Sequence, residues 1–384
     1  MALHHASAKI AFIGQFPPPI NGLTFITSRL ELALKQAGYD ILARNTTGKL
    51  GSRNLLFHLS RLLHTLRALL TIGSLRLSGK SQVCYLTADG GLGLTYSILI
   101  AAWARLLGFR LFIHHHSYSY IVRPRTLMTC LLAVSGSEAV HICLCSEMAQ
   151  DLANCYGRNI RSLTISNATF VDPGKSASPF STRRDLVIGL IGNLTPDKGL
   201  YEFIEIVRIA KARGLPIRGV LAGPIVRDSD RIVLQSLKDE LGEHLDYRGP
   251  VYHAEKARFF ENIDVFVFPT TYLNEAQPTV IFEALANSVP IISFDRGCIR
   301  NQVGNAGCVF RGDANFVVEA LLALDVYCGD PAVLAMHQHA ARARYEVDRR
   351  AGNVQIAQLF DATPSQVRPL SMCESQEAGY DTAR

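Results

Sequence analysis

Short apolar strands alternate with helical patterns along almost the whole chain of 384 residues. Five expected strands lie in the first half, at Lys9–Gly14, Tyr39–Ala43, Val83–Leu86, Arg110–His114 and His141–Leu144. Five more lie in the second half, at Leu186–Ile191, Ile217–Leu221, Leu245–Tyr247, Val265–Phe268 and Pro290–Ser293. Strands that alternate with helices form parallel sheets covered by helices on both faces. The pattern therefore predicts an α/β protein.

One stretch interrupts the alternation. Val171–Pro179 is rich in Pro, Gly and Ser, a composition typical of a linker. Two alternating runs around one linker predict two doubly wound, Rossmann-like domains that face each other across a cleft. We expect an N-terminal domain over residues 1–175 and a C-terminal domain over residues 176–350. A C-terminal helix and a poorly ordered tail are expected over residues 351–384, because the sequence of Ser365–Arg384 is polar and mixed.

Charge is divided unevenly between the two halves. Residues 1–175 contain 17 Lys and Arg but 7 Asp and Glu, and Asp89 is the one acidic residue between residues 41 and 137. A basic half favours an anionic surface or substrate. No stretch has the ~20 uninterrupted apolar residues of a spanning helix, and the N-terminus has no signal-peptide core. The nine scattered cysteines lack zinc spacing and fit a reducing cytoplasm.

The segment Ser52–Ile72 is rich in leucine and basic residues. On a helix its leucines share one arc, and Arg53, Arg61 and Arg67 lie on the opposite arc together with two histidines. The segment can be an ordinary domain helix with its leucines in the core, or a basic amphipathic helix at a membrane surface. Both interpretations hold together if the leucines point inward and the arginines face lipid phosphates.

Two glutamates flank the start of a helix in the second half. Glu275 lies in the loop after the strand Val265–Phe268, and Glu283 lies on the helix that follows. Open α/β sheets bind ligands at the carboxyl ends of their strands. A helix N-terminus favours phosphate, and carboxylates accept hydrogen bonds from sugar hydroxyls. The pair suits a sugar joined to a phosphate, although two solvated glutamates would show the same spacing.

Two other strand-to-helix turns carry groups that suit a phosphate. In the first, Asn21 is a good helix N-cap and Gly22 allows close approach of the backbone. In the second, Asn193 and Lys198 follow the strand Leu186–Ile191, and a lysine at that position can meet a phosphate. Each turn alone is a weak signal, because ordinary βα turns contain the same residues.

Three adjacent histidines follow the fourth expected strand. Alternation along the strand sends His114 and His116 to one side and His115 to the other. Adjacent histidines cannot all bind one metal ion, so we favour hydrogen bonds to sugar hydroxyls over a metal site. The run Asp228-Ser229-Asp230 matches the D-x-D pattern of metal-dependent sugar transferases, but its place before an expected helix Ile232–Leu241 favours helix capping.

Taken together, these segments resemble the family 4 glycosyltransferases of the GT-B fold over residues 9 to about 360. The resemblance rests on the E-x7-E element Glu275/Glu283, the continuation Ala284–Pro290, the turns Lys198-Gly199 and Asn21-Gly22, and the histidine after the fourth strand. The opening Phe16-Pro17-Pro18-Pro19 is similar to a subgroup among bacterial capsule and exopolysaccharide enzymes.

The resemblance implies transfer of a sugar from a UDP- or GDP-linked donor with retention of anomeric configuration, in bacterial polysaccharide biosynthesis. The acceptor would be a glycan, lipid-linked if the basic half meets an anionic membrane surface. No metal, cofactor or nucleic acid is expected to take part. The expected location is the cytoplasm, at the inner face of the plasma membrane if the protein is peripheral.

The resemblance also implies roles for particular residues. Glu275 would lie near the donor sugar, Lys198 would neutralise the leaving diphosphate, and His116 would contact the hydroxymethyl end of the sugar, with His114 as the alternate. Glu283 would bind the ribose hydroxyls, and Gly22 would give a backbone contact. Asn21, Asn193 and Thr279 complete the candidate donor-binding residues.

The sequence departs from the family pattern at two places. Asn193 and Thr195 stand where the family commonly has an arginine before Lys-Gly, and Val289 stands where a glycine is usual before the proline. An inactive homologue that binds nucleotide-sugars is therefore one alternative. A nucleotide-sugar 2-epimerase is another, although it would need further acid–base groups.

Overall fold

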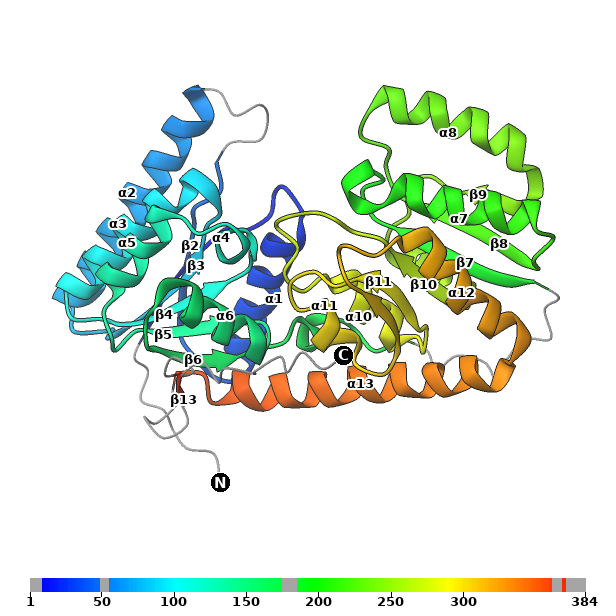
Figure 1. The fold of residues 1–384 in the computed structure, drawn as a ribbon. Helices are drawn as coiled ribbons and strands as arrows, with labels where there is room; N and C mark the ends of the chain where they lie inside the picture. Colours follow the sequence, from blue (N-terminus) through cyan, green and yellow to red (C-terminus); the bar gives the residue numbers. More distant parts are fainter. Residues whose placement is uncertain (1–8, 49–54, 175–184, 361–367, 371–384) are drawn as a thin grey trace, which may run out of the picture. The chain divides into compact units, whose positions relative to one another are not determined.

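The computed structural model describes residues 9–48, 55–174, 185–360 and 368–370. The chain divides into two compact units (Figure 1). Unit 1 comprises Met1–Ile165 and Gln355–Arg384, and unit 2 comprises Ser166–Val354. The second part of the expected linker and nearly all of the expected tail lie outside the described residues.

Unit 1 contains a sheet of seven strands in the order β13-β6-β5-β4-β3-β1-β2. These strands are β1 (Ile10–Gly14), β2 (Ile41–Asn45), β3 (Val83–Ala88), β4 (Arg110–His115), β5 (Val140–Cys143), β6 (Ile160–Thr164) and β13 (Arg368–Leu370). All pairs are parallel except β13 with β6, which is antiparallel. The strand order reverses between β1 and β3, which makes their carboxyl ends the topological switch point.

The helices of unit 1 are α1 (Gly22–Gln36), α2 (Leu55–Leu77), α3 (Leu94–Leu106), α4 (Ser119–Val122), α5 (Thr126–Ser135) and α6 (Ser146–Tyr156), with a 3-10 turn η1 (Gly91–Gly93). Helices α2, α3 and α5 lie side by side on one face of the sheet, and α1 and α6 lie on the other (Figure 1). Strand β1 is buried along its whole length because helices cover both of its faces.

Unit 2 contains a parallel sheet of six strands in the order β12-β11-β10-β7-β8-β9. Its strands are β7 (Leu186–Ile191), β8 (Ile217–Ala222), β9 (Leu245–Tyr247), β10 (Val265–Phe268), β11 (Ile291–Phe294) and β12 (Gly307–Phe310). Read from β9, this is the 3-2-1-4-5-6 order of dinucleotide-binding folds, with its switch point between β7 and β10. The two central strands are almost wholly apolar, as a doubly covered sheet requires.

The helices of unit 2 are α7 (Leu200–Ala212), α8 (Asp228–Leu241), α9 (His253–Glu261), α10 (Thr279–Ala286), α11 (Ile299–Val303) and α12 (Phe316–Gly329). Short 3-10 turns lie at Asn167–Phe170, Pro196–Lys198 and Gly242–His244. Helix α13 (Pro331–Ala357) begins in unit 2 and ends in the part of the chain assigned to unit 1. Within unit 2 it is anchored by Tyr345, whose hydroxyl donates to the Val171 carbonyl at 2.8 Å.

The ten expected strands are all present, with ends that differ by two residues at most. Strands β6, β12 and β13 were not expected, because the polar residues of Ile160–Thr164 and the short run Gly307–Phe310 give no clear strand pattern. Arg368–Leu370 lies in the tail expected to be poorly ordered, but it pairs with β6. Helix α8 begins at Asp228, four residues before the expected start. None of the helices in the described part of the chain has the length and apolarity that crossing a bilayer requires.

The orientation expected for the helix in Ser52–Ile72 is wrong. Helix α2 buries Arg61, Thr65, Ala68 and Ile72, while six leucines are 45–74% exposed along its outer side: Leu56, Leu59, Leu62, Leu63, Leu66 and Leu70. The physical reason is that small and polar side chains of α2 fit against β1 and β2, and Arg61 finds an ionic partner inside. Arg67 is exposed as expected, and Arg53 lies outside the described residues.

Candidate functional site

The switch point of unit 2 brings two candidate segments to one edge of the sheet. The turn from Gly192 to Gly199 follows β7, and the segment from Pro269 to Pro278 follows β10. Because β7 and β10 are parallel neighbours, their carboxyl ends meet at the same edge. Ligands of open α/β sheets bind at such a point.

Lys198 and Glu275 meet at this edge. The Lys198 ammonium donates to Oε2 of Glu275, and the Thr270 hydroxyl donates to the same oxygen at 3.1 Å. The ammonium also lies 4.5 Å from the centre of the Tyr272 ring, within the range of a cation–π contact. The two charged side chains are 24% and 10% exposed. The lysine is thus fixed in place yet remains accessible from solvent.

The close approach of the two segments depends on a glycine. Gly199 has a φ of +85°, and a Cβ at this position would lie 2.2 Å from Cγ of Pro269. Any other residue would push the turn that carries Lys198 away from the end of β10. The Lys-Gly pair noted in the sequence therefore has a steric reason in addition to its charge.

Glu283 has a different partner. It lies on α10, and Nζ of Lys256 on α9 is 2.7 Å from its Oε1 and 2.6 Å from its Oε2. Asn287 donates to the Glu283 main-chain carbonyl at 2.8 Å and closes the end of the helix. Lys256 was not predicted as a site residue, because one lysine on a polar helix carries no motif. Its place on the helix before β10 is the signal that could have found it.

The start of α10 is fixed by buried amides. Gln302 donates to the Pro278 carbonyl at 2.9 Å, and Gln277 accepts from the Asn167 main-chain N–H at 2.7 Å. Thr279 is the first residue of this helix and is partly exposed. Asn193 is exposed in the turn after β7, where no side-chain hydrogen bond holds it to Lys198 or Glu275. Thr279 and Asn193 therefore lie near the carboxyl edge of the sheet, but neither is hydrogen-bonded to the Lys198–Glu275 pair.

In unit 1, the turn after β1 has the expected helix cap. The Asn21 side chain accepts from the Thr24 N–H at 3.1 Å, and the Asn21 N–H donates to the Thr24 hydroxyl at 2.9 Å, which completes a capping box. Gly22 is exposed, and a Cβ built on it would have no neighbour within 4 Å. The space beside Gly22 is therefore open at the N-terminus of α1.

The three histidines alternate as predicted. The rings of His114 and His116 lie 3.9 Å apart, whereas His115 points to the other side and contacts Tyr120 and His141 at 2.9 Å each. Tyr85 holds Nδ1 of His114 at 2.7 Å. Among the residues that the structure describes, Nε2 of His114 and Nε2 of His116 are buried without a hydrogen-bond partner. Buried polar atoms normally have partners, so these two nitrogens are exceptions that a partner absent from the structure would explain.

Burial keeps these imidazoles neutral. It lowers the pKa of His116 to about 3 and the pKa of His141 to about 4. It also lowers the pKa of His114, with smaller contributions from the neighbouring His116 and His115 rings. At neutral pH each ring therefore offers one N–H donor and one nitrogen acceptor, a set suited to hydroxyl groups.

The two aspartates of the D-x-D run lie in different environments. Asp228 is exposed, whereas Asp230 is buried and accepts from the Tyr201 hydroxyl at 2.7 Å. Both lie in the first turn of α8, but Arg227 is the N-cap residue and no side chain caps the helix. The two carboxylates thus interact favourably with the positive end of the helix dipole. The side-chain capping hydrogen bond that was expected is not formed. Within the described ranges, no group of three His, Cys, Asp or Glu could hold a metal ion.

Comparison with known proteins gives matches in sequence and in structure. Residues 175–323 match the family described as "Glycosyl transferases group 1". The capsular polysaccharide biosynthesis glycosyltransferase CapM of Staphylococcus aureus is 29% identical over 141 residues, which cover 35% of this chain. The match spans a third of the length of CapM, 33%.

Two solved structures share the fold over nearly the whole chain. HepE of Anabaena, solved in complex with UDP and glucose, has a TM-score of 0.63 at 16% identity and covers 93% of this chain and 100% of its own. Sucrose-phosphate synthase of Thermosynechococcus elongatus has a TM-score of 0.68 at 17% identity, covering 92% and 98%. At such identities the likeness establishes the fold.

The two sheets and their helices have the GT-B architecture that the sequence predicted. The family match lies over the unit that holds the Lys198–Glu275 pair. The likeness to group 1 glycosyl transferases in sequence thus lies in residues 175–323, whereas the likeness to the solved structures concerns the fold of nearly the whole chain.

Proposed function

We propose that this protein is a family 4 glycosyltransferase that moves a sugar from a UDP- or GDP-linked donor to a glycan acceptor in polysaccharide biosynthesis. Transfer retains the anomeric configuration and needs no metal. The observation that carries this proposal is the Lys198–Glu275 pair at the switch point of unit 2. There a fixed, accessible ammonium stands where the fold binds ligands, beside a carboxylate that can accept hydrogen bonds from a sugar.

The comparisons agree with a nucleotide-sugar donor. HepE was solved with UDP and glucose, and CapM is named for capsular polysaccharide biosynthesis. In this chain, Glu283 would hold the ribose hydroxyls with its carboxylate oriented by Lys256. Asn193, Thr279 and the N-terminus of α1 at Asn21 and Gly22 would supply further contacts to the donor. Nε2 of His116, or of His114, would meet a sugar hydroxyl.

Catalysis would depend on stabilising the charge of the leaving diphosphate. Negative charge on the diphosphate grows as the glycosidic bond breaks, so a cation placed beside it stabilises the transition state more than the bound donor. Lys198 would supply this cation, and Glu275 would keep it in place while the site is empty. Nothing in this scheme requires a side-chain nucleophile.

The test of the function is a transfer assay with purified protein, a panel of UDP- and GDP-sugars, and glycan or lipid-linked acceptors. We expect release of nucleoside diphosphate, a product with the anomeric configuration of the donor by NMR, and turnover that persists in EDTA. Inversion at the anomeric carbon, or activity that EDTA abolishes and manganese restores, would contradict the proposed mechanism. Epimerised donor would favour the epimerase, and binding without any turnover would favour an inactive homologue.

Glu283→Ala should weaken donor binding. A carboxylate that accepts two ribose hydroxyls makes charge-assisted hydrogen bonds worth about 1.5–3 kcal/mol each. We expect the dissociation constant of the nucleotide, measured by calorimetry, to rise at least about tenfold, or about 1.4 kcal/mol. Glu255→Ala on the exposed side of α9 is the matched control and should bind as the wild type. Equal affinity in a folded Glu283→Ala protein would remove Glu283 from the site.

Lys198→Ala should act on turnover. Because the lysine faces a charge that develops during bond cleavage, we expect kcat to fall by about 100-fold or more while the donor KM rises less than about tenfold. Steady-state kinetics at saturating acceptor measure both values. Lys238→Ala changes an exposed lysine on α8 and serves as the control. A normal kcat in Lys198→Ala would assign the ion pair a purely structural role.

We further propose that unit 1 binds an anionic membrane, where a lipid-linked acceptor would be found. The specific observation is the exposed leucine face of α2, which Leu99, Trp103 and Leu106 of α3 extend with exposures of 51%, 38% and 76%. Trp103 donates to the Leu69 carbonyl at 3.1 Å, so the two helices present one apolar surface. Exposed Arg67 and Arg76 border it. Apolar side chains flanked by cations are typical of interfacial helices.

The triple change of Leu62, Leu66 and Leu70 to Gln should abolish vesicle binding. We expect the wild type to sediment with phosphatidylglycerol vesicles, less with phosphatidylcholine vesicles, and less again at high salt, because salt screens the arginines. The same change of Val318, Leu322 and Val326, an exposed apolar row on α12, is the matched control. If the wild type binds neither vesicle type, or if ultracentrifugation shows a dimer that forms through this face, the proposed membrane binding is contradicted.

A further inference from the structure

The turn between β1 and α1 is poorly held by its own atoms. Gln15–Gly22 contains three consecutive prolines, which have no N–H to donate, and the side chains from Pro18 to Gly22 are exposed. Its local support comes from the capping box and from the Thr24 hydroxyl, which lies 2.7 Å from the Pro19 carbonyl and 3.2 Å from the Asn21 carbonyl. A turn that must place Asn21 and Gly22 accurately therefore depends on contacts from other elements.

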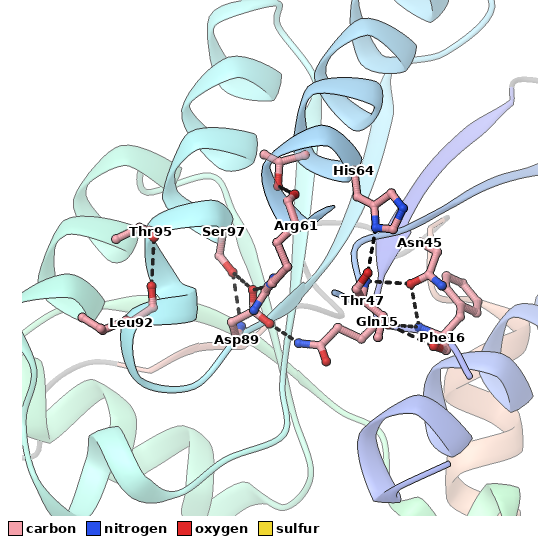
Figure 2. A network of polar contacts seen from close by, with 11 residues as sticks. Gln15, Phe16, Asn45, Thr47, Arg61, His64, Asp89, Leu92, Thr95 and Ser97 are labelled. Atoms are coloured by element: carbon pink, nitrogen blue, oxygen red, sulfur yellow. Dashed lines mark hydrogen bonds and ion pairs between the residues drawn. The ribbon is translucent and has the colours of Figure 1, made fainter. Parts of the chain in front are cut away.

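Those contacts come from both sides of the turn (Figure 2). On one side, the Phe16 N–H lies 3.2 Å from Oδ1 of Asn45 and 3.2 Å from the Thr47 hydroxyl, and His64 of α2 contacts the Thr47 carbonyl at 2.7 Å. On the other side, the Gln15 side-chain amide donates to Oδ1 of Asp89, the residue after β3. The turn is thus clamped at the switch point of unit 1.

Asp89 is held in turn by α2. Arg61 donates to Oδ2 of Asp89 at 2.6 Å, and the Ser97 hydroxyl approaches the same oxygen at 3.4 Å. The Arg61 guanidinium also stacks 4.5 Å from the centre of the Tyr96 ring. The side chains of Arg61 and Asp89 are 10% and 7% exposed. Both carboxylate oxygens of Asp89 thus accept hydrogen bonds from side chains around them.

Filling this space with a buried ion pair costs desolvation free energy. Apolar side chains of similar volume often stabilise a protein as well or better, because burial strips water from both charges. Burial also raises the pKa of Asp89, against the opposing effect of the Arg61 charge and its hydrogen bond. What the pair offers that apolar residues could not is an oriented acceptor for Gln15.

We propose that Asp89, oriented by Arg61, is a positioning residue for donor binding that acts through Gln15 on the turn Gln15–Gly22. The inference rests on the proposed function, in which Asn21 and Gly22 contact the donor. It assigns a role to the lone acidic residue between residues 41 and 137. Asp89 itself touches neither donor nor acceptor in this scheme.

The first test is Gln15→Met, which keeps the length of the side chain and removes its donor. We expect the dissociation constant and the KM of the nucleotide-sugar to rise at least about tenfold, while kcat changes less than about threefold. Gln82→Met, on an exposed glutamine just before β3, is the matched control and should match the wild type. Gln15→Glu, which sets a second carboxylate against Asp89, should weaken donor binding more than Gln15→Met.

The second test separates positioning from stability. The double variant Arg61→Met/Asp89→Leu removes the pair without leaving one charge buried alone, and we expect its melting temperature to stay near that of the wild type. Its donor affinity should nevertheless fall as in Gln15→Met, and adding Gln15→Met should cause no further loss, because the changes share one interaction. Unchanged affinity in the double variant, or losses that simply add, would overturn the inference.

Hydrogen exchange keeps the inference separate from the proposed function. If the wild type binds no nucleotide-sugar, the proposed function fails, but the amides of residues 15–24 can still be followed by mass spectrometry. We expect faster exchange of this segment in Gln15→Met and in Arg61→Met/Asp89→Leu than in Gln82→Met. Equal exchange in all three variants would show that Asp89 does not position the turn, whatever the protein binds. If the double variant does not fold, the two Gln15 variants decide the outcome.

Discussion

Parallel strands covered by helices on both faces leave little room for polar chemistry inside a domain. In unit 2 the central strands β7 and β10 present apolar side chains to both faces, so charged groups can gather only where the strands end. Because the strand order reverses between β7 and β10, the loops that follow these two strands diverge at the carboxyl edge of the sheet. Lys198 and Glu275 lie on these two loops, and their ion pair joins them. The apolar sheet therefore dictates where the candidate site lies.

The strand pattern of unit 2 could be predicted because it depends on local sequence. The strands β7 and β10 are short and apolar and end before Gly192 and Pro269, and Lys198 and Glu275 lie in the segments that follow them. Lys256 was missed because its contact with Glu283 joins two helices that are separated by β10, and its place on the helix before β10 is the one local signal for it. The early start of α8 was missed for a related reason: Asp228 and Asp230 lie inside the first turn, whereas the sequence favours them as caps before it.

Helix α2 shows where periodicity stops being informative. The pattern correctly predicts one leucine-rich arc and one basic arc, but hydrophobicity alone cannot decide which arc faces the sheet. The orientation of α2 depends on two long-range partners. Asp89, after β3, pairs with Arg61, and the carbonyl of Thr47, after β2, contacts His64. With Arg61 and His64 placed against these partners, the leucine arc faces outward, and no window of local sequence contains that information.

The same inversion changes what the basic charge of unit 1 can do. Asp89 is the one acidic residue between residues 41 and 137, and Arg61 neutralises it inside the fold. The exposed basic residues of that segment, Arg67 and Arg76 among them, therefore keep their charge beside the leucine face with no carboxylate from the same segment to oppose it. Arg61 is thus buried against Asp89 while the leucine arc faces outward, and the segment leaves no unpaired carboxylate there to repel an anionic surface. Asp89 also accepts a hydrogen bond from Gln15. The carboxylate that pairs with Arg61 on the buried side of α2 therefore also supports the turn before α1.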